Sequence, residues 1–223
     1  MAENQYRGAW TPFSWVEKYQ YAFSGSGQKA ALALTFDDGP DPDFTPRILA
    51  ILRKYHVKAT FFLLGENMEK YPLLVKEIAA AGHVIGNHTY SHPKLPALSM
   101  TDFEQEIFKT DVLVQHLAGY RPRFIRPTYG AITEEQVAWL TREQMMVIQW
   151  SVDTLDWKGL SPEEITKTVE GNALPGSIIL QHNAEGVPLD GTVVALEQFI
   201  PRLQAKGARF VTVAEMFDLP KER

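Results

Sequence analysis

Two adjacent aspartates, Asp37 and Asp38, stand where the apolar segment 31–36 gives way to a Gly-Pro turn. Neighbouring carboxylates repel each other, so this pair costs stability unless a cation or another specific partner offsets the charge. Farther along the chain, His88 and His92 are separated by three residues. Imidazole nitrogens and a carboxylate are natural ligands of a divalent cation, and three protein ligands leave room for chemistry. The two histidines and one aspartate of the pair are therefore candidate metal ligands.

Other chemically useful side chains follow other apolar segments of the sequence. They are Arg126, Tyr129, Asp153, Asp156, Trp157 and His182. Each one alone has an ordinary structural explanation, such as an Asp-rich turn, a loop histidine or a buried arginine. Their shared position after strand-like segments favours a common site, because the carboxyl ends of parallel strands gather at one rim of a sheet or barrel.

The elements that must position these residues follow from the hydrophobic pattern. Seven apolar segments predict strands, at 31–36, 58–64, 83–88, 123–127, 146–152, 177–182 and 209–213. Amphipathic segments predict helices at 46–55, 72–81, 102–118, 133–142, from 161 onward, and 192–206. Strands that alternate with helices and are apolar nearly throughout indicate an α/β fold with a mostly parallel sheet, either doubly wound or a barrel of fewer than eight strands.

Two helix starts have recognisable capping signals. We expect Thr101, with Glu104 three residues later, to form a capping box at the start of the third helix. Ser161 followed by Pro162 predicts the start of the fifth helix.

Composition narrows the functional class. The chain has 223 residues and is 45% hydrophobic, which is enough for a large core. Its formal charge of −5 argues against nucleic acid as a partner. It has no cysteine, which excludes disulfides and thiolate metal sites. We find no transmembrane segment, because no apolar run is long enough, and no recognisable signal peptide. Residues 1–28 are expected to be an aromatic-rich extension that packs on one domain, 29–223.

Five short motifs, in order, resemble those of the polysaccharide deacetylases, the NodB homology or carbohydrate esterase 4 family. They are TFDDGP at 35–40, HTYSH at 88–92, RPTYG at 126–130, DTLDW at 153–157 and LQH at 180–182. The resemblance covers about 30–215 and implies a distorted (β/α)7 barrel. It also implies one divalent metal, with zinc expected first and cobalt, nickel or manganese as alternatives.

The resemblance further implies a role for each site residue. Asp37 corresponds to the general base and is held by Arg126. Asp38, His88 and His92 correspond to the metal ligands. The remaining roles are the oxyanion contact from the backbone N–H of Tyr129, the general acid His182, its partner Asp156, and the acetyl-pocket walls Trp157 and Leu180. The sequence departs from the usual pattern at Thr128, where a second proline is common, and at Asn183, where aspartate is frequent. Asp153 remains an alternative partner for His182.

The expected function is metal-dependent removal of N-acetyl groups from N-acetylglucosamine units of a glycan, with release of acetate. Chitin-like chains, peptidoglycan and poly-N-acetylglucosamine are all candidate substrates. An O-acetyl xylan esterase, a glycan-binding barrel without turnover and a metal-free barrel enzyme are the alternatives. Because polymeric glycans lie outside the cell, we expect an extracellular or cell-surface location, and we expect a monomer.

Three histidines and one motif are expected to have no part in this chemistry. His56 and His116 lie near predicted helix ends and His83 opens a predicted strand, so all three are expected to be structural. The glycosylation pattern Asn87-His88-Thr89 overlaps the proposed metal site and is taken as chance.

Overall fold

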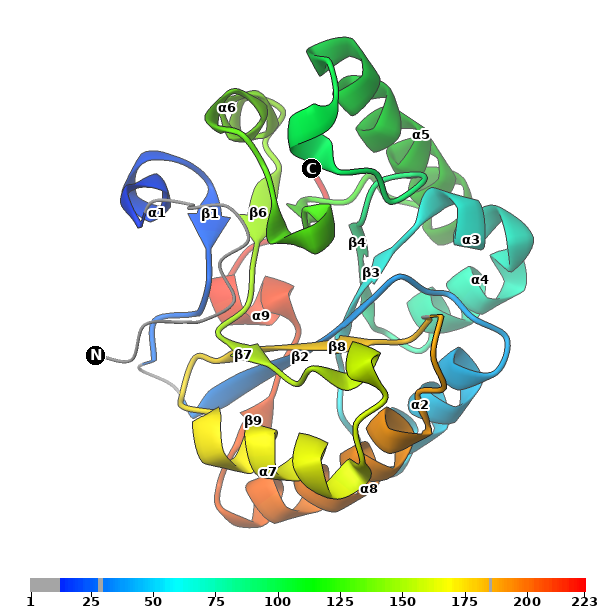
Figure 1. Ribbon diagram of the computed structural model, residues 1–223, viewed down its shortest axis with the longest axis vertical. Coiled ribbons are helices and arrows are strands. Elements are labelled where there is room, and N and C mark those ends of the chain that lie inside the picture. Colours follow the sequence, from blue (N-terminus) through cyan, green and yellow to red (C-terminus); the bar gives the residue numbers. More distant parts are fainter. Residues whose placement is uncertain (1–12, 28–29, 185) are drawn as a thin grey trace.

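The computed structural model describes residues 13–27, 30–184 and 186–223 of the chain. Within these residues, nine strands form one sheet in the order β1-β6-β5-β4-β3-β2-β8-β7, with β9 beside β2 (Figure 1). All of these strand pairs are parallel. The strands are β1 (Tyr21–Ala22), β2 (Ala31–Asp37), β3 (Thr60–Leu63), β4 (Val84–Asn87), β5 (Phe124–Ile125), β6 (Met146–Ile148), β7 (Val152–Asp153), β8 (Ile178–His182) and β9 (Arg209–Phe210).

The sheet is strongly curled. Strands β6 and β7 are consecutive in the chain but lie near opposite ends of the strand order. Ile148 and Val152 are four residues apart in the chain. Their Cα atoms can therefore be at most about 14 Å apart, even where the chain is fully extended. The two ends of the sheet must therefore come close together, which makes the fold a distorted (β/α)7 barrel, as expected.

Helices surround this sheet, most of them on its outer face, although the last helix packs against side chains of the inner face (Figure 1). They are α1 (Ser14–Lys18), α2 (Phe44–Lys54), α3 (Gly65–Lys70), α4 (Pro72–Ala80), α5 (Met100–Ala118), α6 (Glu134–Arg142), α7 (Pro162–Asn172), α8 (Asp190–Ala205) and α9 (Val213–Phe217), with short 3₁₀ turns at Leu95–Ala97, Thr128–Gly130 and Asp156–Lys158. The largest apolar cluster lies between the sheet and α2, α4, α7 and α8. None of the helices in the described part of the chain has both the length and the apolar character needed to cross a membrane.

Strand β2 is buried along its whole length and explains how one strand serves both the core and the site. Successive side chains of a strand point to opposite faces. Leu34 and Phe36 join the outer cluster, where Phe36 stacks on Phe61 at 5.1 Å between ring centroids. Thr35 and Asp37 point to the inner face, where both contact Arg126.

The predicted strands and helices are all present, with several differences. The segment 146–152 divides into β6 and β7, and β9 ends at Phe210 because α9 follows it. The prediction that Thr101 caps the third helix is wrong, because Ser99 is the N-cap and its hydroxyl accepts the N–H of Asp102. The prediction at Ser161 is confirmed, with a complete capping box. Helices α1, α3 and α9 and the strand β1 were not expected.

The described part of the N-terminal extension packs on the rest of the chain. Strand β1 extends the sheet by pairing with β6. Trp15 and Tyr21 are buried with their rings 5.9 Å apart, whereas Phe13 is largely exposed. Trp10 lies outside the described residues, as do 1–12 as a whole and 28–29. The division into an extension and one domain stays a prediction.

Candidate active site

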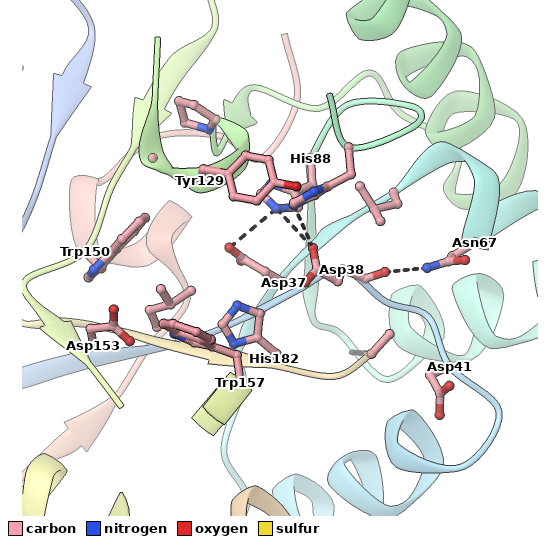
Figure 2. Close-up of a pocket in the computed structure, with 16 residues that line it drawn as sticks. Asp37, Asp38, Asp41, Asn67, His88, Tyr129, Trp150, Asp153, Trp157 and His182 are labelled. Carbon is pink, nitrogen blue, oxygen red and sulfur yellow. Dashed lines mark hydrogen bonds and ion pairs between the residues drawn. The ribbon is translucent and has the colours of Figure 1, made fainter. Parts of the chain in front are cut away.

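The candidate site lies at the carboxyl ends of neighbouring strands. Asp37 ends β2 and is paired in register with His182, which ends β8. His88 directly follows β4, and Arg126 directly follows β5. Because all these strands run in the same direction, residues distant in the sequence meet at one rim, and Figure 2 shows Asp37, Asp38, His88 and His182 facing one cavity.

The three candidate metal ligands converge. The Oδ1 atom of Asp38 lies 3.3 Å from Nε2 of His88 and 3.4 Å from Nε2 of His92. One ligand atom from each residue lies within 4.8 Å of the other two. Asp38 Oδ1 is also buried without a hydrogen-bond partner among the described residues. A buried carboxylate oxygen without a hydrogen-bond donor is costly, and a cation between it and two imidazole nitrogens would remove that cost, so the residues fit a divalent ion.

Contacts behind His88 orient its ring for this task. Its Nδ1 lies 2.8 Å from the carbonyl oxygen of Arg126, so Nδ1 carries the proton and donates it. The Nε2 atom is then the one that faces Asp38, which is the orientation that metal-binding histidines commonly have.

The charges of the three groups depend on one another. Burial by itself lowers the pKa of His88, but the carboxylates of Asp37 and Asp38 outweigh it and raise that pKa above its ordinary value. Burial raises the pKa of Asp38, but the neighbouring imidazoles, His88 above all, outweigh burial and hold that pKa below its ordinary value. Burial and the proximity of His88 lower the pKa of His92. Asp38 is therefore kept ionised and His92 neutral, the forms that bind cations, whereas the carboxylates favour a proton on His88 that a bound cation would displace.

Asp37 has a different partner from Asp38. Its Oδ1 accepts a hydrogen bond of 2.8 Å from Nη1 of the fully buried Arg126. Arg126 also donates to the carbonyls of Ile148 and Gln149, and its guanidinium lies 4.3 Å from the ring centroid of Phe62. These contacts hold the arginine in place, so one oxygen of Asp37 is paired with it. The other oxygen, Oδ2, lies 3.7 Å from Nε2 of His88.

His182 is paired with Asp156. Its Nδ1 lies 2.7 Å from Oδ1 of Asp156, whose Oδ2 accepts the backbone N–H of His182 and the hydroxyl of Thr192. Burial lowers the pKa of His182, but Asp156 outweighs burial and raises it to about 10. The imidazole is thus protonated near neutral pH. Asp153, the alternative partner, instead accepts the N–H of Leu155, and burial raises its pKa.

The cavity beside these groups has a volume of about 710 Å³. The remaining expected pocket residues, Tyr129, Trp157 and Leu180, all line it, and Tyr129 and Trp157 are 60% and 40% exposed. Arg126 and Asp156 do not line the cavity but lie behind the residues that they contact. The structure therefore brings together every residue that the sequence nominated.

Sequence reasoning missed several residues that complete the cavity. Trp150 lies beside Asp153, while Asp41 and Asn67 lie on the other side, beyond Asp38 (Figure 2). Asn67 donates a 2.7 Å hydrogen bond to the carbonyl oxygen of Asp38. It belongs to α3, a helix of six residues, and so short a helix carries little periodic signal.

The two departures from the family pattern both make contacts at this rim. The hydroxyl of Thr128 donates to the carbonyl oxygen of Pro93, the residue after His92. Asn183 accepts the N–H of Gly39 at 3.2 Å and donates to the hydroxyl of Thr45. Each residue thus ties a loop that carries a candidate metal ligand to a neighbouring segment.

Backbone strain is concentrated at the same rim. Asp38, Thr89, His92, Tyr129 and Leu155 all have positive φ, between 56° and 73°. Residues other than glycine rarely adopt such φ values, so this backbone conformation persists only where surrounding contacts enforce it.

These features define a curled parallel α/β barrel with one candidate metal centre and a separate carboxylate and histidine at its carboxyl-end rim. The sequence model of the polysaccharide deacetylase family matches residues 24–148. The chain belongs to this family, also known through its structures as carbohydrate esterase family 4.

Proteins with similar sequences or structures match most of the length of this chain. A peptidoglycan-N-acetylglucosamine deacetylase of Bacillus cereus is 59% identical over 217 residues, which is 97% of this chain and 79% of the relative. The enzyme PgdA of Listeria monocytogenes, with the same activity in its name, is 39% identical over 83% of this chain, but the match spans only 38% of PgdA. A crystal structure of a peptidoglycan N-acetylglucosamine deacetylase with a bound N-oxidanyl-benzamide superposes with a TM-score of 0.95, at 59% identity, and covers 96% of this chain and 100% of that one.

Proposed function

We propose that this chain is a metal-dependent hydrolase that removes N-acetyl groups from N-acetylglucosamine units of peptidoglycan and releases acetate. The observation that carries the proposal is the convergence of Asp38, His88 and His92 beside Asp37 and His182 in one cavity. The names of the Bacillus cereus and Listeria relatives support the choice of substrate.

We assign one divalent cation to Asp38, His88 and His92. Two imidazoles and a carboxylate make zinc the first candidate, and cobalt, nickel or manganese accept the same ligand types. When bound, such an ion supplies Lewis acidity, which polarises the acetyl carbonyl and acidifies water.

The residues around the ion divide the proton transfers between them. Asp37 takes the proton from the attacking water as general base, while Arg126 keeps its other oxygen paired. The N–H of Tyr129 donates to the oxyanion that forms as water adds to the acetyl carbon. His182, with Nδ1 engaged by Asp156, protonates the leaving nitrogen from Nε2 as the C–N bond breaks. The products are acetate and a free glucosamine amine.

The rest of the cavity suits a neutral sugar with an acetamido group. Trp157 and Leu180 form apolar walls for the methyl group, and the exposed rings of Tyr129 and Trp157 offer stacking surfaces for sugar rings. Among the described residues that line the cavity there are four aspartates and no lysine or arginine. N-acetylmuramic acid carries a lactyl carboxylate next to its acetamido group, so this lining favours N-acetylglucosamine over it.

Because peptidoglycan lies outside the cytoplasmic membrane, we propose that the chain acts at the cell wall. The monomeric state expected from the sequence stays a prediction.

Acetate release from a panel of glycans tests the proposal. The panel contains peptidoglycan, chitooligosaccharides, poly-N-acetylglucosamine and acetylated xylan, each with and without a chelator. We expect chelator-sensitive release from peptidoglycan, at glucosamine positions identified by mass spectrometry. Release from acetylated xylan alone would indicate an esterase, and no release from any glycan would indicate a binding protein. Release that persists after complete metal removal would contradict the metal assignment.

A further inference from the structure

The loop that carries both candidate ligand histidines has an unfavourable backbone shape. Thr89 and His92 have φ values of 71° and 62°, in the left-handed region. This region is disfavoured for residues other than glycine and asparagine, so the loop needs support from outside itself. Its shape matters because the positions of His88 and His92 depend on it.

Glu106, on α5, supplies such support at the middle of the loop. Its Oε2 accepts the backbone N–H groups of Tyr90 and Ser91 at 2.9 and 2.8 Å, and its Oε1 accepts the Ser91 hydroxyl at 2.9 Å. Tyr90 and Ser91 are two of the three residues between the histidines. Hydrogen bonds to an ionised carboxylate are roughly twice as strong as neutral ones. One side chain therefore fixes most of the segment between the two ligands.

The start of the loop is held independently of Glu106. Asn87, fully buried, donates to Asp111 Oδ1 on α5 at 2.9 Å and accepts the N–H of Thr89 at 2.7 Å. From the other side, the N–H of Gly65 at the start of α3 bonds the Thr89 carbonyl at 3.0 Å. These anchors attach residues 87–89 to α5 and α3 without Glu106, so the contribution of Glu106 to the rest of the loop can be measured in a folded protein.

We propose that Glu106 is a positioning residue for cation binding, which holds His88 and His92 at ligand spacing before an ion arrives. The inference rests on the proposed metal site. Ordering the loop in advance removes an entropic cost that binding would otherwise carry, so cation affinity depends on Glu106 although it is not a ligand.

The test measures zinc affinity of the metal-stripped full chain by competition with a chromophoric chelator. Glu106→Gln keeps the size of the side chain but loses the charge and one acceptor, and we expect an affinity at least about tenfold weaker. Ser91→Ala removes only the hydroxyl contact and is expected to weaken affinity about two- to threefold. Glu104→Gln is the matched control on the same helix, since the hydrogen bonds from Tyr90 and Ser91 to α5 go to Glu106, and its affinity and activity should equal those of the wild type.

The unfolding temperature of each metal-stripped variant separates positioning from simple stability. A lower unfolding temperature for Glu106→Gln with unchanged zinc affinity would overturn the proposal, as would equal weakening in Glu104→Gln. If Glu106→Gln does not fold, unchanged affinity in Ser91→Ala overturns it. His88→Ala separates a failure of the proposed metal site from a failure of the proposed role of Glu106. If that variant binds zinc like the wild type, the metal site itself is wrong, whereas if it has lost zinc and Glu106→Gln has not, only the role of Glu106 fails.

Discussion

The two ends of strand β4 carry the same residue type in opposite surroundings. His83 precedes the strand and His88 follows it, and each is only 3% exposed. The Nδ1 of His83 accepts the backbone N–H of Ala59 at 3.1 Å, and its ring contacts that of Phe61. Burial lowers the pKa of His83 to about 4, so this ring is neutral. At the other end, Asp37 and Asp38 raise the pKa of His88.

The difference follows from the direction of the strands. Every pair in this sheet is parallel, so the residues that end β2, β8 and β4 accumulate at one rim. At the opposite end of β4, a histidine satisfies one backbone group, and the nearby charge that acts on its pKa is the cation of Lys58, which lowers it further. Burial alone therefore does not make a histidine functional. The charged groups that other strands deliver to its position do.

The largest effects should come from the two residues proposed to move protons. We expect Asp37→Asn and His182→Ala each to lower kcat at least about 100-fold, because each loses a general base or acid. His83→Asn, at the far end of the sheet, should leave kcat unchanged. Initial rates of acetate release measure all three variants. Turnover near the wild-type rate in either of the first two would remove that residue from its role.

A second comparison concerns metal content and uses the two histidines of β4 directly. We expect His88→Ala to retain at most about a tenth of the wild-type cation content, since a ligand contributes more than the contacts that orient it. His83→Asn should retain all of it. Elemental analysis after purification gives both values. Full occupancy in His88→Ala would exclude His88 from the ligand set and undermine the contrast between the two ends.

The sequence predicted the strand ends well because their signal is local. Each buried strand is a short apolar run, and the polar residue that ends it is adjacent in the chain, as with Asp37 after 31–36. Because all the strands are parallel, the polar residues that directly follow them in the sequence lie together at one rim of the barrel. The same logic brought Asp38, His88 and His92 together from segments some 50 residues apart.

What the sequence could not predict depends on tertiary pairing. Both Ser99 with Asp102 and Thr101 with Glu104 match a capping pattern, and in the structure α5 begins at Met100 with Ser99 as its N-cap. The run 146–152 is continuous in composition but spans the two ends of a curled sheet, so it breaks into β6 and β7. Glu106 has no local feature that marks it, because its three partners belong to a loop 15 residues earlier.

The choice between Asp153 and Asp156 was open for a related reason. The two aspartates are three residues apart, and either could face His182 from the sequence alone. A residue with positive φ, Leu155, reverses the chain between them. That turn places Asp156 against the ring and leaves Asp153 at the cavity wall.

The third comparison concerns stability rather than catalysis, and it tests only His83, at the start of β4. Because the pKa of His83 is about 4 in the folded protein and near 6.5 in the unfolded chain, protonation favours unfolding. The stability that the neutral ring contributes is present above pH 6.5 and is lost as the pH falls through that value toward 4. The loss should amount to about 3 kcal/mol between pH 7 and pH 4.

His83→Asn isolates this contribution, because asparagine does not titrate and its Oδ1 can accept the N–H of Ala59 in place of Nδ1. Urea unfolding at pH 7 and pH 4 should show a smaller loss of unfolding free energy for the variant than for the wild type. Equal losses would mean that His83 is solvated or paired in a way that keeps its pKa ordinary. The two histidines of β4 would then differ only in their acidic neighbours, and burial would have no part in keeping the structural one neutral.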